Sequence, residues 1–274
     1  MARTERTTEG EGLPPPRFGE QDARLSYGSY LKVPDLLSLQ RLLSDPPAHD
    51  ELLFIVDHQV YELWFKELLF ELESVRDLIT RGDVHAARHL LDRAHAIERV
   101  LIAQIEVIES MSPQDFLEFR TNLAPASGFQ SVQFREIEFL SGLKDEDYLR
   151  RLELDDDERA RLTKRLREPT LWEAFCTLLD NRDLPMPADD PEIRRASLLE
   201  MARNRAAHAD EHALSESLLD HDELFRLWRQ RHVLMVERQI GSKTGTGGSS
   251  GASYLRTTLE KRFFPELWEL RSYL

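Results

Sequence analysis

The sequence predicts an all-α protein, and three observations support this fold class. Segments that alternate β-branched and polar residues, as half-buried strands do, are nearly absent from the 274 residues. Long segments instead repeat apolar residues at helical spacing. Several of these segments begin at a capping residue or end at a glycine. The sequence contains no internal repeat, so we expect the helices to form a bundle around one core.

The N-terminal segment, residues 1–24, is polar and rich in Pro and Gly. It has no apolar stretch of the kind found in a signal peptide, and we expect it to be disordered. Residues 25–274 are expected to form a single helical domain. Its first long helix is expected over residues 50–82, with a glycine as its stop, and its second over about residues 83–111.

Capping signals mark the shorter helices that follow. Ser112 and Asp115 form a capping box that begins a helix. The segment PASGFQ then breaks the chain before a further helical segment, SVQFREIEFLSG. Thr170 and Glu173 form a second capping box, ahead of LWEAFCTLLDNR.

The last long helix is expected over about residues 222–240, some distance after a Pro- and Asp-rich linker at residues 180–191. Gly241 supplies the glycine that often ends a helix. The segment that follows, SKTGTGGSSG, concentrates glycines and hydroxyl side chains. It is not a phosphate-binding P-loop, because no strand precedes it and Lys243 follows a serine. A loop that closes over a ligand and a solvent-exposed linker are both compatible with this composition.

Composition argues against several classes of protein. The formal net charge of -14 argues against non-specific nucleic-acid binding, which requires a cationic surface. No apolar run approaches the roughly 20 residues of a membrane span. The one cysteine, Cys176, excludes an internal disulfide, and its apolar helical surroundings favour inert packing. We therefore expect a soluble, cytoplasmic protein with neither nucleic-acid nor membrane partners.

Two of the long helices carry a histidine on an apolar face. On the first helix, side chains at spacings of four, three and four residues share one face, namely Phe54, His58, Tyr61 and Phe65. The other positions are also largely apolar, including Val56 and Leu63, so we expect this helix to be buried on most sides. On the late helix, the corresponding stripe comprises Phe225, Trp228, His232, Met235 and Val236.

A single buried histidine most often serves only to hydrogen-bond a neighbouring carbonyl group. Two of them on separate buried helices, His58 and His232, favour an apolar slot with an imidazole on each side. This arrangement resembles a haem pocket, in which one histidine binds the iron. Two further pairs with the spacing of a zinc-binding helix are predicted to lie on solvated faces, His85 with His89 and His208 with His212.

With these residues assembled, the sequence resembles the tryptophan 2,3-dioxygenase family from about residue 25 to the C-terminus. Five blocks support the resemblance, in this order: LSYGSYL, HDELLFIVDHQVYELWFKELLFEL, MSPQDFLEFR, LAPASGFQSVQFREIEFLSG and LWRQRHVLMVERQIGSKTGTGGSSG. The family implies an all-helical homotetramer with one haem b per subunit. It also implies cleavage of the indole C2–C3 bond of L-tryptophan by dioxygen, which gives N-formyl-L-kynurenine and begins the kynurenine route.

The resemblance implies roles for individual residues. His232 matches the iron ligand, and His58 matches the histidine that accepts a hydrogen bond from the indole N–H. Arg120 matches the arginine that binds the substrate carboxylate, for which a guanidinium fork is suited. Thr246 matches the residue at the ammonium and carboxylate end, and Phe116 lies at a substrate-binding position that is tyrosine in some relatives.

Further matches concern short segments. The residues beside His58 that match the substrate-binding stretch are Phe54, Ile55, Val56 and Asp57. A segment that family members contribute to a neighbouring subunit's pocket is matched by Tyr27, Tyr30 and Leu31. Cofactor-binding positions are matched by Ser127 and Gly128.

Three other functions are weighed against this one. A haem monooxygenase of the same fold, acting on a tryptophan derivative in secondary metabolism, would keep His232 and the pocket. A haem-based oxygen sensor without turnover would have no need of Arg120 and Thr246. A helical scaffold without a cofactor would purify as a colourless protein.

Overall fold

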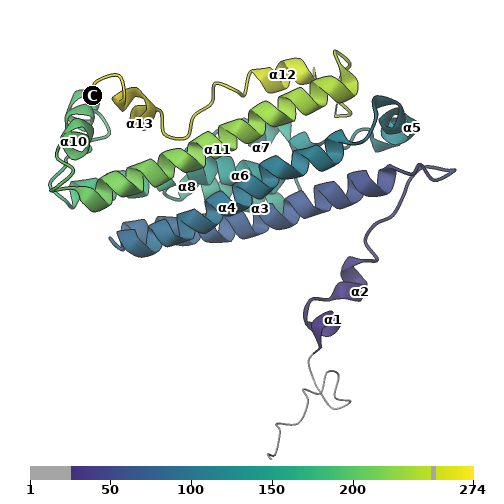
Figure 1. The fold of residues 1–274 in the computed structure, drawn as a ribbon, viewed down its shortest axis with the longest axis horizontal. Helices are drawn as coiled ribbons and strands as arrows, with labels where there is room; N and C mark the ends of the chain where they lie inside the picture. Colours follow the sequence, from purple (N-terminus) through teal and green to yellow (C-terminus); the bar gives the residue numbers. More distant parts are fainter. Residues whose placement is uncertain (1–25, 248–250) are drawn as a thin grey trace, which may run out of the picture. The chain divides into compact units, whose positions relative to one another are not determined.

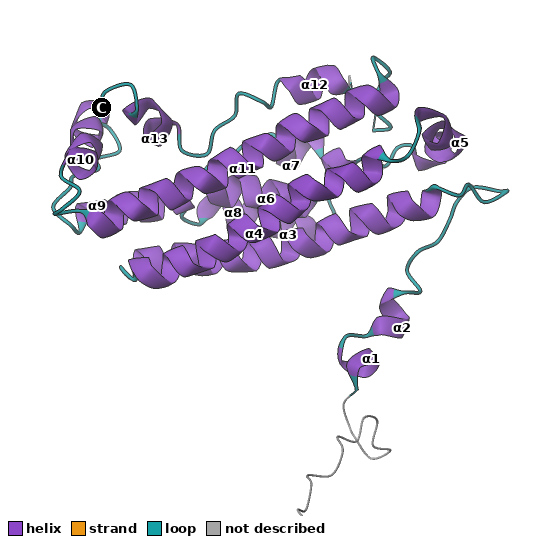
Figure 2. Ribbon diagram, viewed as in Figure 1, coloured by secondary structure: helices purple, strands orange, loops and turns teal. Residues whose placement is uncertain are grey.

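The computed structural model describes residues 26–247 and 251–274, and these residues form helices joined by loops, without a strand (Figure 2). The all-α prediction is thereby confirmed. The predicted disordered segment, residues 1–24, lies outside the described residues. Within the described ranges, no helix combines the length and the apolarity that crossing a bilayer requires.

The chain divides into two compact units, one ending at Arg41 and one spanning Leu42–Leu274. The described part of the first unit contains two four-residue helices, α1 (Tyr27–Tyr30) and α2 (Val33–Leu36). The second unit contains all the other helices. The grouping of residues 25–274 into a single domain stays a prediction.

Three long helices form the framework of the second unit, namely α3 (Glu51–Thr80), α4 (Val84–Glu109) and α11 (Ala209–Ile240). They lie side by side, and α4 packs against both α3 and α11 (Figure 1). The α3–α4 turn passes through Gly82, whose φ of 79° favours glycine. Asp83 then begins α4 by accepting a hydrogen bond from the Ala86 N–H. The two helices predicted over residues 50–82 and 83–111 are confirmed.

The shorter helices pack around this framework. They are α5 (Pro113–Leu123), the 3₁₀ helix η1 (Gly128–Gln130), α6 (Val132–Ser141), α7 (Tyr148–Arg151), α8 (Asp156–Arg167), α9 (Leu171–Asp180), α10 (Pro191–Arg203), α12 (Ala252–Arg256) and α13 (Pro265–Leu270). Both predicted capping boxes are present, at Ser112 with Asp115 and at Thr170 with Glu173. The predicted linker joins α9 to α10.

The predicted start of the last long helix is wrong, because α11 begins at Ala209 and not near residue 222. The earlier turns also have a buried apolar face, which includes Leu214 and Leu218. Asp222 does not cap a helix but lies buried inside one. Its carboxylate accepts hydrogen bonds from the backbone N–H groups of Phe263 and Phe264, at 2.9 and 3.1 Å.

The prediction that α3 is buried on most sides is also wrong. One stripe of the helix is exposed, and Val56 and Leu63 retain 40% and 51% of their accessible surface. The opposite face is buried, with Leu68 and Leu72 fully enclosed in the core. The helix is therefore apolar on two faces, of which only one packs against the rest of the chain.

A buried polar network fixes α4, α6 and α11 relative to one another. The His221 ring lies 2.5 Å from Glu98 Oε1 through Nδ1 and 2.9 Å from Ser141 Oγ through Nε2. All three side chains are buried, and burial raises the pKa of Glu98. Because a buried polar group is costly to leave unpaired, this network favours one register of the three helices. That register sets the position of the C-terminal half of α11.

Candidate functional site

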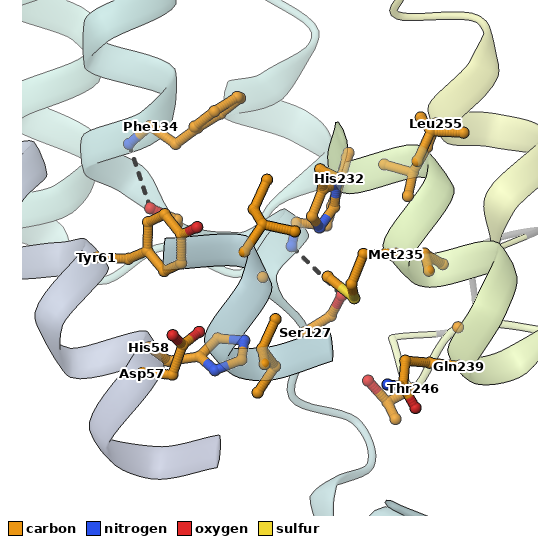
Figure 3. Close-up of a pocket in the computed structure, with 18 of the residues that line it drawn as sticks. Asp57, His58, Tyr61, Ser127, Phe134, His232, Met235, Gln239, Thr246 and Leu255 are labelled. Carbon is orange, nitrogen blue, oxygen red and sulfur yellow. Dashed lines mark hydrogen bonds between the residues drawn. The ribbon is translucent and has the colours of Figure 1, made fainter. Parts of the chain in front are cut away.

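A cavity of about 280 Å³ opens between α3, α5, α11 and the loop that follows α11. Parts of α4, α6 and α12 complete its wall, and most of the lining is apolar. His58 on α3 and His232 on α11 both line the cavity, on different walls (Figure 3). The predicted slot with an imidazole on each side is therefore present. The predicted burial of His58 is wrong, because this side chain is exposed, whereas His232 is half-buried.

The α3 wall orients the His58 ring. Its Nδ1 lies 2.8 Å from the carbonyl oxygen of Phe54, one turn earlier. Since a carbonyl oxygen can only accept, Nδ1 carries the proton in the neutral ring, and Nε2 is left as an acceptor. The centroid of the Phe54 ring lies 4.1 Å from that of the imidazole, and the Phe116 ring stacks on Phe54 with centroids 5.8 Å apart.

The α11 wall presents His232 in apolar surroundings. Burial lowers the pKa of His232 to about 4, and His58 contributes in the same direction. The Trp228 ring stacks on the imidazole with centroids 4.9 Å apart and planes within 7°. Within residues 26–247 and 251–274, neither ring nitrogen of His232 has a hydrogen-bond partner. His232 is therefore a neutral imidazole with an available lone pair, which is the form that binds metals.

The loop after α11 is held against α5 and the segment before η1. Arg120 donates a hydrogen bond from Nη2 to the carbonyl oxygen of Thr244. Thr246 donates from its hydroxyl group to the carbonyl oxygen of Ala126, at 2.6 Å. Both Arg120 and Thr246 line the cavity. The loop therefore forms part of the cavity wall, which favours a ligand-covering role over that of an exposed linker.

Glycine is required at two positions of this loop. A Cβ atom at Gly247 would lie 2.7 Å from the Cβ atom of Ser127. Gly251 has a φ of 63°, and a Cβ atom there would lie 2.5 Å from the carbonyl oxygen of Lys243. The glycines thus permit close approach of the loop to its own backbone and to the segment before η1.

Most of the predicted site residues meet in this cavity. Those that line it are Phe54, Asp57, His58, Phe116, Arg120, Ser127, Gly128, His232 and Thr246. Ile55 and Val56 do not line it, and Val56 lies on the exposed stripe of α3. Tyr27, Tyr30 and Leu31 belong to the separate unit that ends at Arg41, and their role stays a prediction.

Sequence reasoning missed part of the polar lining. Glu138 lies between Arg135 and Arg229, with oxygen–nitrogen distances of 2.5 and 2.8 Å. Burial acts to raise the pKa of Glu138, but these two guanidinium groups hold it below its usual range. Gln239, in the last turn of α11, also lines the cavity. The apolar spacing of α11 predicts which face of the helix lines the cavity. It does not predict the polar residues next to that face.

The remaining candidate groups do not gather into a second site. Among the described residues, no set of three or more His, Cys, Asp and Glu side chains could hold a metal ion. His85 and His89 are exposed, and His208 immediately precedes α11. Burial raises the pKa of Cys176 to about 12, which agrees with inert packing.

Comparison with known proteins identifies the family. The family model described as tryptophan 2,3-dioxygenase matches residues 17–186 and 189–274. A protein named tryptophan 2,3-dioxygenase from Nocardioides sp. is 59% identical over 94% of this chain and 97% of its own length. Proteins of the same name from Herpetosiphon aurantiacus and Serratia proteamaculans are 44% and 41% identical, each over 91% of this chain and over 98% and 93% of their own lengths. The chain therefore belongs to the tryptophan 2,3-dioxygenase family.

Proposed function

We propose that this chain is a haem-dependent enzyme that cleaves the indole C2–C3 bond of L-tryptophan with dioxygen, giving N-formyl-L-kynurenine. This reaction is the first step of the kynurenine route of tryptophan degradation. Family membership supports the reaction class. The observation that supports it best in the structure is the pairing of His58 and His232 on two walls of one apolar cavity. A cytoplasmic location remains a prediction from composition.

The residues of the cavity fit a haem group. His232 offers a neutral imidazole nitrogen that has no hydrogen-bond partner among the described residues, as an iron ligand requires. The surrounding surface is mainly apolar, as a porphyrin face requires, and Ser127 and Gly128 also line the cavity. Haem iron, when bound through His232, would supply the site at which dioxygen is activated.

The other side chains would bind and orient the substrate. Arg120 would pair with the carboxylate of tryptophan, and the Thr246 hydroxyl would bind the same end of the molecule. His58 would accept a hydrogen bond from the indole N–H at Nε2, because its Nδ1 donates to the Phe54 carbonyl group. Together these contacts would hold the indole C2–C3 bond in one position, which is the main contribution of a binding site to such a reaction.

The part of the loop over residues 241–247 would exclude water from the loaded site. Its attachments through Arg120 and Thr246 involve the same two residues that would bind the amino-acid end. Substrate binding and loop position would therefore be coupled. A drier site strengthens the contact between Arg120 and the carboxylate, since the effective dielectric constant falls.

Absorption spectra of the reduced protein with and without L-tryptophan, followed by product analysis under air, test this proposal. We expect a haem spectrum that changes with L-tryptophan and a product that contains two additional oxygen atoms, both from ¹⁸O-labelled dioxygen. A product with one additional oxygen atom would instead identify the monooxygenase of the same fold. A haem protein that binds no amino acid would support the alternative of an oxygen sensor. A colourless protein would support the alternative of a helical scaffold without a cofactor.

Replacing His58 with alanine should reduce turnover without abolishing it. We expect a loss of about tenfold, because one orienting hydrogen bond is removed while no obligatory proton transfer is lost. Steady-state turnover of L-tryptophan by the haem-loaded variant provides the measurement. Complete inactivity with intact haem and substrate binding would show that His58 is an essential base.

We also propose that the enzyme is a homotetramer, as the family implies. The exposed stripe of α3 supports self-association, because Val56, Leu63 and Phe70 follow one another at intervals of seven residues and are 40%, 51% and 63% exposed. Exposed apolar residues at the same interval also occur on α4, at Val100 and Val107, and on α11, at Leu227 and Leu234. Apolar surface of this extent is typical of an interface between proteins.

Replacing both Leu63 and Phe70 with glutamate should dissociate the assembly. Burying two carboxylates in an apolar interface costs several kcal/mol, enough to change the mass of the particle at micromolar concentration. Light scattering coupled to size-exclusion chromatography provides the measurement. The control is Thr80→Glu, which adds a carboxylate at an exposed position on another face of α3 and should leave the mass unchanged. A double variant with the wild-type mass would exclude this stripe as the interface.

A further inference from the structure

The cavity wall contains a buried acceptor that has no hydrogen-bond partner among the described residues. The Gln239 side chain is 8% exposed, and its Nε2 donates a hydrogen bond of 2.7 Å to the carbonyl oxygen of Met111. Because that carbonyl oxygen can only accept, the atom facing it must be Nε2. The orientation of the amide is therefore fixed, and Oε1 is the atom that points away from Met111. Within the described residues, Oε1 is buried without a hydrogen-bond partner. An unsatisfied buried acceptor costs about 1–3 kcal/mol, which favours a ligand that supplies a donor.

An unpaired donor accompanies this acceptor in the same cavity. Nε of Arg120 is buried without a partner within the described residues, although Nη2 of the same side chain bonds to Thr244. Gln239 lies at the end of α11, and the loop that begins at Gly241 carries Thr244 and Thr246. Met111, to which Gln239 bonds, packs in the same small cluster as Phe116, one turn before Arg120. The fold thus brings the unpaired acceptor and the unpaired donor to the α5 side of the cavity.

These groups match the two charges of an amino acid. A carboxylate is an acceptor and suits Arg120, whereas an ammonium group is a donor with three N–H bonds and suits an amide oxygen. The Thr246 hydroxyl donates to Ala126, so its oxygen can only accept from a ligand. Figure 3 shows Gln239 and Thr246 in the same part of the cavity. The cavity lining therefore offers two acceptors for an ammonium group, Gln239 Oε1 and Thr246 Oγ1.

We propose that Gln239 determines specificity by accepting a hydrogen bond from the α-ammonium group of the substrate. This inference rests on the proposed function and adds a residue to it. The carboxylate alone would be recognised equally in any indole acid. The acceptor at Gln239 makes the site selective for indole acids that carry a free amino group. An analogue without that group leaves Oε1 buried and unpaired, which is a strong basis for rejection.

The test compares two ligands that differ only in the ammonium group, L-tryptophan and indole-3-propionate. Each is titrated into the haem-loaded enzyme, and binding is measured from the change in the haem absorption spectrum. The Gln239→Met variant keeps the length of the side chain but has no oxygen acceptor. We expect it to weaken L-tryptophan binding by about 10- to 100-fold and to leave indole-3-propionate binding within about twofold.

A matched control separates this effect from a loss of structure. Gln133→Met removes a glutamine that also donates to a backbone carbonyl, at Glu62, but does not line the cavity. It should change neither ligand's affinity. Gln239→Lys keeps a donor for the Met111 carbonyl but has no acceptor, and it should also lose the preference for L-tryptophan, so it serves as the second variant if Gln239→Met fails to fold.

Two outcomes would overturn the inference. Equal weakening of both ligands by Gln239→Met would assign Gln239 a structural role only. Unchanged binding of both ligands would mean that Oε1 is satisfied by water and does not contact the substrate. Failure of the proposed function is distinguishable, because the wild-type enzyme would then give no product with two additional oxygen atoms from L-tryptophan.

Discussion

Replacing His232 with alanine is expected to abolish tight haem binding. We propose that this imidazole is the iron ligand, and among the described residues no other histidine of α11 lines the cavity. The apolar contacts of the remaining cavity cannot replace the lost iron–imidazole bond. We therefore expect the affinity for haem to fall by about 100-fold or more, since loss of groups that only orient metal ligands already costs about 10- to 100-fold. The Soret band of the purified variant, titrated with haem, provides the measurement.

Two controls make this result specific. His212→Ala removes another half-buried histidine of α11, near the start of the helix, and should leave the Soret band unchanged. Added imidazole should partly restore the band in His232→Ala, because the small ligand can occupy the volume that the side chain leaves. A normal Soret band in His232→Ala without imidazole would remove this residue from the role of iron ligand.

The parts of the site that lie on one helix could be predicted from the sequence. The spacing of Phe54, His58 and Tyr61 places these side chains on one face, and all three line the cavity. The same reasoning identified the face of α11 that presents His232. Local periodicity suffices in these cases because a helix fixes the direction of each side chain relative to its neighbours.

The parts that join distant segments could not be predicted in this way. Gln239 bonds to Met111 over 128 positions of the chain, and Arg120 bonds to Thr244 over 124 positions. No local pattern encodes which carbonyl group a side chain will meet after folding. Arg120 was identified only through the family resemblance, and Gln239 was not identified at all.

The error in the burial of α3 has a different origin. Apolar residues on two faces of a helix indicate that both faces avoid water, but they do not indicate which molecule covers each face. Within this subunit, one face of α3 packs into the core while Leu63 and Phe70 stay exposed. The homotetramer proposed above would resolve the discrepancy, since the sequence pattern would then describe the burial of α3 in the assembly.

Replacing Arg120 with leucine is expected to raise the L-tryptophan concentration needed for half-saturation by about 100-fold, because the substrate carboxylate would lose its charged partner in a partly desolvated site. Steady-state kinetics of the haem-loaded variant measure this change. We expect a smaller decrease in turnover at saturation, since the contact would exist before and during the reaction. Arg120→Lys keeps the charge but not the two-pronged geometry, and should fall between the wild type and Arg120→Leu.

Arg120 also holds the loop through Thr244, so a loosened loop must be separated from a lost carboxylate contact. Tryptamine, which has the indole ring and the ammonium group but no carboxylate, makes this distinction. If Arg120 acts on the carboxylate, Arg120→Leu should leave tryptamine binding within about twofold of the wild type, since no charge pair is lost. If the loop is the main cause, tryptamine and L-tryptophan should weaken together. Unchanged kinetics with L-tryptophan would contradict both roles, and the carboxylate partner would then have to be sought among the other cationic groups of the cavity, Arg135 and Arg229.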